Sequence, residues 1–354
     1  MRIAQVAPLF ESVPPKGYGG TERVISYLTE ELVRQGHHVT LFATADSVTQ
    51  GTLISSVAHP LRAEMLNRSW LAYDAIQMDK LARLVKNVDI LHFHSDYLHF
   101  PLARQLGIPH VTTLHGRLDL PELIPLFEHF SNCPLVSISD NQRSPLPWAN
   151  WSGTVHHGLP VDLMQFHPAK GKYFVFVGRL SPEKRVDRAI EIAIACDTPL
   201  QIAAKIDQAD IGYFESTIKP LLTHPLIHFV GEVDEQQKHA LLAQAKALLF
   251  PIDWPEPFGL VMIEAFACGV PVIAYPHGSV PEIIEHGVNG FIVHNQKEAI
   301  QAAMHIDQSI NRADCRACFE ARFTASAMVR NYLQLYQRLL PRADFILNGK
   351  NHGR

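Results

Sequence analysis

The sequence predicts an α/β protein built from two doubly wound, parallel-sheet domains that face each other across a cleft. Short apolar runs alternate with amphipathic helical stretches along most of the chain, the alternation loosens over residues 148–172, and it then restarts. Strands that are apolar on both faces are typical of parallel sheets covered by helices. The chain of 354 residues is also long enough for two domains.

The first half of the chain begins with an apolar strand at residues 2–8. A helix is expected over Thr21–Gln35, with Thr21 as its N-cap and Gly36 as its C-cap. Further strand-like runs follow, with helical stretches between them, at residues 38–44, 89–94, 110–115 and 134–139. The stretch WANWSGTVHHGLPVDLMQFHPAKGK at residues 148–172 is rich in Gly, Pro and His, which favours an interdomain linker.

The second half repeats the alternation. Its strand-like runs are residues 173–180, 199–206, 227–233, 247–252, 270–275 and 290–293. A long helix with apolar positions at helical spacing is expected over Thr324–Leu340. Each half is therefore Rossmann-like, and a ligand is expected in the cleft between the carboxyl ends of the two sets of strands.

The composition bounds the class of protein. A formal net charge of −4 argues against a general nucleic-acid binder. No apolar run approaches the roughly 20 residues that span a bilayer. The N-terminal residues, MRIAQVAPLF, fit a first strand better than a signal peptide. Five cysteines at irregular positions suggest no disulfide framework, so a cytoplasmic location is expected.

Several basic side chains between the second and third predicted strands are expected on solvated helix faces. They are Arg62, Arg68, Lys80, Arg83 and Lys86. A peripheral membrane contact there would need an amphipathic basic helix, and the sequence shows no clear one.

Two glutamates stand out in the apolar stretch EPFGLVMIEAFACGVPVIAY, which starts at Glu256. Glu264 is the one charge in a helix expected over Gly259–Cys268, which is apolar nearly all round and should be buried. A buried carboxylate must be paired or hydrogen-bonded, because leaving it bare costs several kcal/mol. Two readings remain open: Glu264 accepts hydrogen bonds from the hydroxyls of a ribose, or it forms a structural ion pair with a Lys or Arg.

The start of this helix is a predicted anion site. Glu256 lies in the loop that leads into the helix, and the backbone N–H groups of Phe258, Gly259, Leu260 and Val261 follow it. Unpaired N–H groups and the positive end of the helix dipole favour a phosphate there. A phosphate with one carboxylate beside it and a second further along the helix would suit a nucleotide-sugar.

Two other segments fit an anionic ligand. Arg179 ends a strand and Lys184 precedes a helix, so the two cations could clamp a diphosphate without a metal, although either alone could be ordinary surface charge. A glycine loop at residues 17–20, which includes Gly19 and Gly20, precedes the first helix. It lacks the third glycine of the dinucleotide fingerprint, because position 22 is Glu, so NAD is disfavoured.

Histidines suggest the acceptor side of the cleft and no metal site. His115 is expected at the end of a strand, facing the cleft, and His94 at the cleft end of its neighbour, lining an acceptor pocket. His92 and His99 do not complete a zinc site with His94, and the cysteine pair at residues 315 and 318 lacks a second pair.

Taken together, these motifs resemble glycosyltransferase family 4. The resemblance rests on E-P-F-G-x-x-x-x-E followed by A-x-G-x-P-V-I-A, on G-R-L-x-x-E-K, on the glycine loop, on L-H-G, and on P-E-I-I-x-x-G-x-N-G-F at residues 281–291. It covers nearly the whole chain and is most specific over residues 256–290. It implies the GT-B fold, with an acceptor-side domain at residues 1–165 plus 325–354 and a donor-nucleotide domain at residues 166–324.

The resemblance also implies roles on the donor side. Arg179 and Lys184 would hold the diphosphate, Glu264 the ribose, and Gly19 and Gly20 would lie beside the diphosphate from the opposite domain. Val233 would lie near the base. Phe258, Gly259, Leu260 and Val261 would lie near the sugar hydroxyls and the phosphate through their backbone. One departure is Arg185, where the family usually has Gly.

The implied reaction is retaining transfer of a sugar from a nucleotide-diphosphate sugar to a hydroxyl acceptor, catalysed without metal or cofactor. Glu256 would contact the transferred sugar and His115 would lie near the anomeric centre. The acceptor could be a sugar, a lipid-linked sugar or a small molecule. A GT-B sugar phosphorylase and a non-catalytic sugar-nucleotide-binding protein remain alternatives, whereas a glycoside hydrolase is disfavoured because Glu256 and Glu264 should point at different parts of a ligand.

Overall fold

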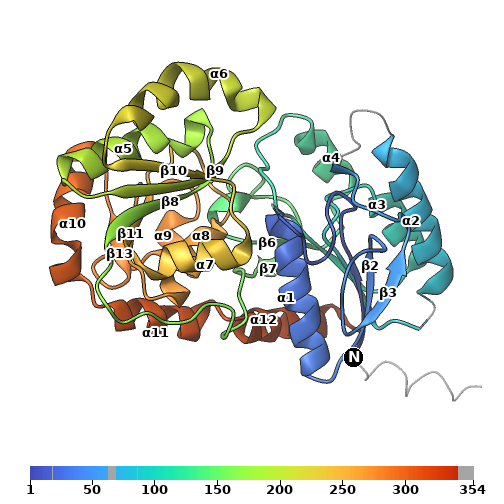
Figure 1. Cartoon of the computed structure of the whole chain (residues 1–354). Helices are drawn as coiled ribbons and strands as arrows, with labels where there is room; N and C mark the ends of the chain where they lie inside the picture. Colours follow the sequence, from blue (N-terminus) through green and yellow to red (C-terminus); the bar gives the residue numbers. More distant parts are fainter. Residues whose placement is uncertain (18, 63–68, 86, 342–354) are drawn as a thin grey trace, which may run out of the picture.

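The computed structural model describes residues 1–17, 19–62, 69–85 and 87–341. Two parallel sheets form separate domains that lie side by side, and the chain passes from the first to the second after residue 154 (Figure 1). The two parallel α/β domains expected from the sequence are therefore confirmed.

The first sheet has the strand order β3-β2-β1-β4-β5-β6-β7. Its strands are β1 (Arg2–Val6), β2 (His38–Ala43), β3 (Thr52–Ser55), β4 (Ile90–Phe93), β5 (His110–Thr113), β6 (Leu135–Ser137) and β7 (Trp151–Thr154). The central strands are buried along nearly their whole length because helices cover both faces of the sheet. These helices include α1 (Gly20–Arg34), α2 (Trp70–Leu84), α3 (Phe100–Leu106) and α4 (Leu123–His129).

The second sheet has the order β10-β9-β8-β11-β12-β13. Its strands are β8 (Tyr173–Arg179), β9 (Leu200–Lys205), β10 (Ile227–Gly231), β11 (Ala245–Phe250), β12 (Val272–Ala274) and β13 (Gly290–Ile292). Its longer helices are α5 (Val186–Ala195), α7 (Glu235–Ala243), α8 (Leu260–Ala267), α10 (Gln296–Ser309) and α11 (Arg312–Arg322), and the short helices are α6 (Ile211–Tyr213) and α9 (Val280–Ile283). Both sheets are parallel throughout, so the carboxyl ends of their strands can converge on one cleft.

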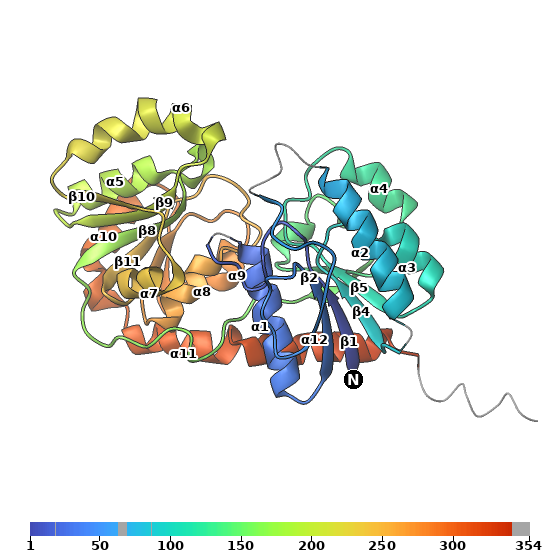
Figure 2. The same ribbon diagram turned by 45° about the vertical axis from the view of Figure 1, so that its right-hand side comes forward.

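The last described helix, α12 (Ala325–Leu339), returns from the second domain to the first (Figures 1 and 2). It packs against α1, and the side chains of Tyr332 and Tyr336 are fully buried. The Tyr336 hydroxyl lies 2.6 Å from Nδ1 of His92 in β4, and the Tyr332 hydroxyl lies 3.0 Å from Oγ1 of Thr113 in β5. The helix expected over Thr324–Leu340 is confirmed, with Thr324 as its N-cap.

Two acidic side chains of the second domain bind the first domain across the cleft. Glu235, at the start of α7, lies 2.8 Å from the guanidinium of Arg23 and accepts a hydrogen bond from the hydroxyl of Tyr27, both in α1. Glu282, in α9, accepts hydrogen bonds from the backbone N–H groups of Asp140 and Asn141. The structure therefore has the two domains in direct polar contact.

The structure corrects three local predictions. Helix α1 begins at Gly20 with Gly19 as its N-cap, so Thr21 lies inside the first turn. The stretch expected to be only a linker contains β7, which pairs with β6 and extends the first sheet. The strand β3 was missed, because its four residues form a half-buried edge strand without a continuous apolar run.

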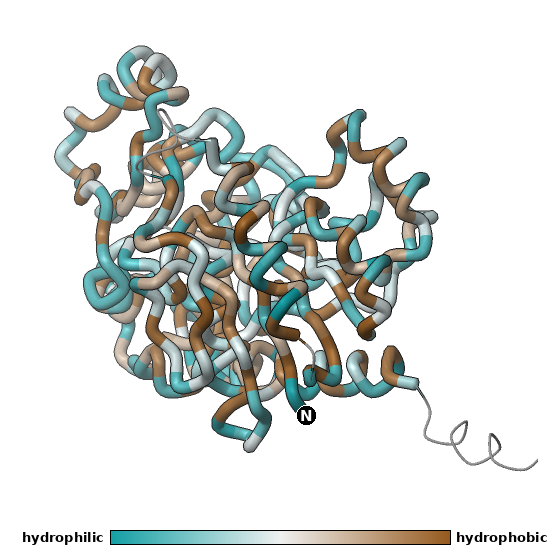
Figure 3. The backbone as a smooth tube through the Cα atoms, turned by 90° about the vertical axis from the view of Figure 1, so that its right-hand side faces the viewer, coloured by the Kyte–Doolittle hydropathy of each residue, from teal (hydrophilic) through white to brown (hydrophobic). Residues whose placement is uncertain are grey.

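No helix within the described part of the chain is long and apolar enough to cross a membrane. Hydrophilic and hydrophobic residues are interspersed along most of the backbone (Figure 3). Of the basic residues expected on helix faces, Lys80 and Arg83 lie in α2, whereas Arg62 lines the cleft and pairs with Glu11. Arg68 and Lys86 lie outside the described residues.

Candidate functional site

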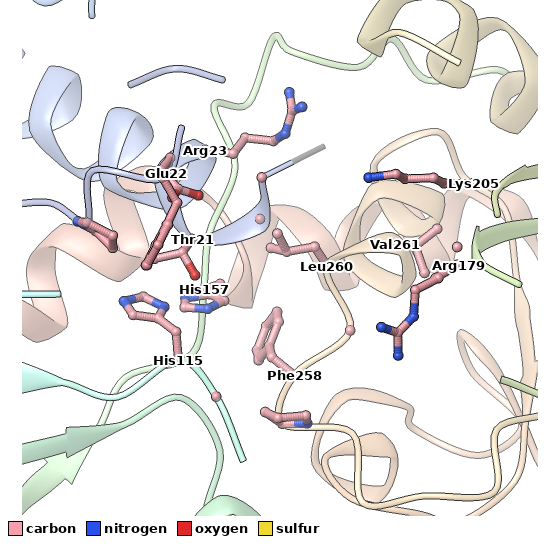
Figure 4. Close-up of a pocket in the computed structure, with 18 of the residues that line it drawn as sticks. Thr21, Glu22, Arg23, His115, His157, Arg179, Lys205, Phe258, Leu260 and Val261 are labelled. Atoms are coloured by element: carbon pink, nitrogen blue, oxygen red, sulfur yellow. The ribbon is translucent and has the colours of Figure 1, made fainter. Parts of the chain in front are cut away.

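A cleft of about 760 Å³ lies between the two domains. Its walls come from the loops that follow β1, β4 and β5 in the first domain and β8, β9, β10 and β11 in the second. Figure 4 shows His115 and His157 on one wall, Arg179 and Lys205 on the other, and Phe258 and Leu260 between them. Every site residue predicted from the sequence lines this cleft: Gly19, Gly20, His94, His115, Arg179, Lys184, Val233, Glu256, Phe258, Gly259, Leu260, Val261 and Glu264.

Glu264 has the ion pair of one of the two readings that the sequence left open. It is 2% exposed, in the middle of the buried helix α8, and it also lines the cleft. Its Oε1 lies 2.5 Å from Nζ of Lys238, which projects from α7. The carboxylate is therefore ion-paired, and it still has oxygen lone pairs that can accept from a ligand hydroxyl.

Glu256 has a lysine partner of its own. Its carboxylate forms an ion pair with Lys184 and accepts a hydrogen bond from Nε1 of Trp254 at 2.9 Å. The ammonium group of Lys184 also lies 5.1 Å from the ring centroid of Trp254 and 5.7 Å from that of Phe250. Glu256 and Lys184 thus hold each other at the floor of the cleft, on the side of the second domain.

Arg179 is surrounded by carboxylates. Its guanidinium lies 2.5 Å from Glu183, 3.6 Å from Asp210 and 3.7 Å from Asp207. Its side chain is 38% exposed, so these pairs can be exchanged for an incoming anion at little cost. The sequence predicted the two cations Arg179 and Lys184, but it did not predict that both would already have acidic partners.

The N-terminus of α8 opens into the cleft. Gly259 precedes the helix with a φ of 78°, in the left-handed region. A Cβ at this position would also lie 2.9 Å from Cε of Met262, which is the flexible end of that side chain, so glycine is favoured here mainly by the backbone conformation. Gly20 of the first domain approaches the same end, because a Cβ there would lie 3.5 Å from Cδ1 of Leu260. The glycine loop and the helix N-terminus therefore meet across the cleft.

The histidines of the first domain form a hydrogen-bonded chain. Nδ1 of His94 lies 2.9 Å from Nε2 of His115, and Nε2 of His94 lies 2.7 Å from Oε1 of Gln5. Burial lowers the pKa of His115 to about 3 and that of His94 well below its usual value, so both rings are neutral at pH 7. A neutral imidazole at His115 brings hydrogen-bonding capacity to the cleft without positive charge.

Arg185 adopts a left-handed backbone conformation, with φ 53° and ψ 48°. It lies between the 3₁₀ turn Pro182–Lys184 and α5. The side chain pairs with Asp187 at 2.7 Å and with Asp253 at 3.1 Å. A position that favours glycine thus holds an arginine whose ion pairs offset part of the conformational cost.

Other residues that line the cleft were missed in the sequence. They include Glu22, Arg23, Trp70, Asp74, Asp96, His157, Lys205 and Lys238. The Thr-Glu-Arg that follows the glycine loop could have indicated Glu22 and Arg23. His157 lay in the stretch interpreted as a linker, and the helix that carries Trp70 and Asp74 gave no strong periodicity.

Among the described residues, no group of three or more His, Cys, Asp or Glu side chains is arranged to hold a metal ion. His92 bonds to Tyr336 and Thr113, and His99 bonds to Thr112 and stacks on Phe93, so both have structural contacts. The five cysteines are free thiols.

Comparison with known proteins places this cleft in a family. Residues 164–322 match the family model described as Glycosyl transferases group 1, and residues 18–151 match the model described as Glycosyltransferase Family 4. Both halves of the cleft fall within these two matches.

Curated relatives span most of the chain. The chain is 28% identical over 358 residues to the GDP-mannose-dependent alpha-(1-6)-phosphatidylinositol dimannoside mannosyltransferase of Mycobacterium tuberculosis, with 91% of each protein covered. It is 26% identical over 318 residues to the N-acetyl-alpha-D-glucosaminyl L-malate synthase of Bacillus anthracis, covering 80% of this chain and 81% of that protein.

The fold is shared with solved glycosyltransferases. AviGT4, a glycosyltransferase involved in avilamycin A biosynthesis, superposes with a TM-score of 0.75 and 21% identity, covering 96% of this chain and 97% of that chain. The two Rossmann-like domains therefore have the GT-B arrangement expected from the sequence. Because the two family models together match most of the chain, the protein belongs to the family 4 glycosyltransferases.

Proposed function

We propose that this glycosyltransferase transfers a sugar from a nucleotide-diphosphate sugar to a hydroxyl acceptor, with retention of the anomeric configuration and without a metal ion. The observation that carries the proposal is the convergence of Arg179, Lys184 and the N-terminus of α8 on one cleft. Two cations and a helix dipole are the groups that bind and stabilise a diphosphate.

The donor would lie along the second-domain wall of the cleft. Glu264 would accept hydrogen bonds from the ribose hydroxyls, and Val233 would contact the base. The diphosphate would lie between Arg179, Lys184 and the start of α8, with Gly19 and Gly20 facing it from the first domain. The approach of Gly20 to Leu260 supports this placement, because it brings the glycine loop of the first domain to the start of α8.

Donor binding would exchange two of the ion pairs in the cleft. The diphosphate would compete with Glu256 for Lys184 and with Glu183 for Arg179, because a diphosphate carries more charge than one carboxylate. Glu256 would then be free to face the transferred sugar. The carboxylate of Glu256 would therefore be released toward the sugar only when the diphosphate of the donor has taken its place beside Lys184.

In the transfer step, the bond between the anomeric carbon and the leaving phosphate oxygen breaks. The acceptor oxygen bonds to that carbon from the same face, and its hydroxyl proton passes to the leaving phosphate oxygen. Arg179, Lys184 and the α8 N-terminus would stabilise the charge that develops on the diphosphate. Glu256 and the neutral ring of His115 would face the positive charge that develops on the sugar.

The printed names of the relatives support a nucleotide-sugar donor, since one is GDP-mannose-dependent. They also show that acceptors differ, because one relative uses phosphatidylinositol dimannoside and another produces a malate conjugate. The shape of the pocket, rather than the motifs, sets which donor base, which sugar and which acceptor the enzyme uses. The free thiols suit a reducing cytoplasm, where we place the enzyme.

A thermal-shift screen tests the donor assignment. UDP, GDP and ADP and their hexose conjugates are added to the purified protein, and a ligand at 100 times its dissociation constant should stabilise it by about 2.7 kcal/mol. Stabilisation by one nucleoside diphosphate and its sugars supports the proposal. Stabilisation by none of them, or release of a sugar 1-phosphate from a glycoside and inorganic phosphate, would replace it with a phosphorylase or another function.

A further inference from the structure

The first-domain wall of the cleft has aromatic and acidic side chains next to the His94–His115 pair. We call Phe10, Trp70, Asp74, Asp96 and Tyr97 the aromatic–acidic wall. All five line the cleft, and they come from the loop after β1, from the first turns of α2 and from the loop after β4. Asp96 and Tyr97 follow His94 closely in sequence, so the wall adjoins the proposed reaction centre.

The aromatic part is a surface formed by two elements. The ring centroids of Phe10 and Trp70 lie 5.9 Å apart, with a tilt of 52° between the rings. Trp70 and Asp74 are four residues apart in α2 and therefore lie on one face of that helix. An aromatic ring next to a carboxylate offers an apolar surface and a hydrogen-bond acceptor to the same ligand.

The charged part of the wall is negative. Within the described residues, neither Asp74 nor Asp96 has an ion-pair partner, whereas the three arginines on this side are each paired: Arg23 with Glu235, Arg62 with Glu11 and Arg117 with Asp119. Burial, together with the neighbouring charge of Asp96, raises the pKa of Asp74 to about 6. The wall thus offers a ligand two carboxylates that have no ion-pair partner among the described residues.

A buried polar group next to this wall also lacks a partner. His157 is 4% exposed, lines the cleft and lies beside His115, with the two ring centroids 5.3 Å apart (Figure 4). Its Nδ1 has no hydrogen-bond partner within the described part of the chain. Such a group is costly to bury unless a ligand satisfies it.

Building on the proposed transferase function, we propose that the acceptor is an uncharged, hydroxyl-rich carbohydrate that stacks on Trp70 and donates hydrogen bonds to Asp74 and Asp96. Sugar hydroxyls satisfy carboxylate oxygens, and the C–H face of a sugar ring covers an aromatic side chain. A phosphate or carboxylate on the acceptor would lie against these two carboxylates. The wall therefore disfavours anionic acceptors.

Matched acceptor probes test this inference. The full-length protein is supplied with the nucleotide sugar that stabilises it, and transfer is measured to p-nitrophenyl glucoside, galactoside and mannoside, to p-nitrophenyl glucuronide, and to p-nitrophenyl glucosaminide. We expect transfer to at least one uncharged hexoside at ten or more times the rate for the glucuronide. An equal or faster rate with the glucuronide or the amine, or no transfer to any uncharged hexoside, overturns the inference.

Three variants test whether the aromatic–acidic wall causes the preference for an uncharged acceptor. Trp70→Ala, Asp74→Asn and Asp96→Asn should each raise the KM for the preferred hexoside at least tenfold and leave the donor KM within twofold. Asn suits position 96 because it tolerates the left-handed backbone of Asp96, at φ 45°. The controls are Trp148→Ala, an exposed tryptophan, and Asp79→Asn, in the same helix but paired with Arg83 outside the cleft. Variants that behave like the controls would overturn the assignment.

The readouts separate this inference from the proposed function. If the protein neither binds nor hydrolyses any nucleotide sugar, the donor assignment fails. If it binds and hydrolyses one but prefers an anionic acceptor, the donor assignment stands and the acceptor inference fails.

Discussion

At the scale of single residues, the lysines and glutamates of the cleft are paired with one another. Lys184 pairs with Glu256 and Lys238 with Glu264, across 72 and 26 positions of sequence. The sequence predicted Glu256 and Glu264 from their positions before and within a buried helix, and Lys184 from its place at the start of the helix that follows Arg179. It left open an ion pair for Glu264 but could not name the partners, because residues so far apart along the chain are brought together only by the tertiary fold.

Lys184 should act mainly by binding the diphosphate of the donor. Lys184→Ala removes a cation from the phosphate site, so we expect affinity for the nucleoside diphosphate to fall at least tenfold, which is about 1.4 kcal/mol. Isothermal titration calorimetry measures this change. Lys219→Ala, an exposed lysine paired with Glu215 away from the cleft, serves as the control. Unchanged affinity in folded Lys184→Ala protein would remove the residue from the donor site.

The two glutamates should differ in the kinetic step that they affect. Glu264→Gln keeps an acceptor oxygen for Lys238 but meets a ribose diol less well, so it should mainly raise the donor KM. Glu256→Gln removes negative charge where positive charge develops, so it should mainly lower kcat. Steady-state donor kinetics and the Tm of both variants are the measurements. If Glu264→Gln lowers only the Tm, the carboxylate is a structural ion-pair partner and nothing more.

At the scale of elements, the sequence predicted those whose apolar residues form a continuous pattern. The central strands and α8 were found because burial on all sides leaves uninterrupted apolar runs. The edge strand β3 and the strand β7 were missed, because β3 is half-buried and β7 lies in a stretch rich in Gly, Pro and His. Edge strands have one unpaired side, so their sequences carry a weaker hydrophobic signal.

The turn before α5 offers a test of backbone strain. Arg185→Gly and Arg185→Ala both remove the ion pairs with Asp187 and Asp253, but only glycine adopts the left-handed conformation without strain. The glycine variant should therefore be more stable than the alanine variant by about 1 kcal/mol. Chemical denaturation of the two variants measures the difference. An alanine variant at least as stable as the glycine variant would show that the turn relaxes in solution.

At the scale of the whole molecule, the fold brings the carboxyl ends of two parallel sheets to one cleft. The alternation of strands and helices was enough to predict two such domains facing each other. The contacts that join the two domains, such as Glu235 with Arg23 and Glu282 with the backbone of Asp140 and Asn141, have no local sequence signature. The sequence did not predict the aromatic–acidic wall for the same reason, because its residues come from three separate segments.

The account also predicts how the whole enzyme responds to chelation. Arg179, Lys184 and the α8 N-terminus are proposed to stabilise the charge on the leaving diphosphate. Treatment with EDTA should therefore leave the transfer rate within about twofold of the rate of the untreated enzyme. The rate is followed with the preferred nucleotide sugar before and after dialysis against EDTA. Loss of activity that Mg²⁺ or Mn²⁺ restores would show that a metal shares this role.

The central claim is that the cleft catalyses retaining transfer from a nucleotide-diphosphate sugar. The most direct measurement is proton NMR of the product formed from an α-linked nucleotide hexose and an uncharged hexoside, read at the new anomeric signal. The account predicts release of the nucleoside diphosphate and an α-linked product. A β-linked product would contradict retention, and a nucleotide sugar left intact in the presence of acceptor would contradict the transfer itself.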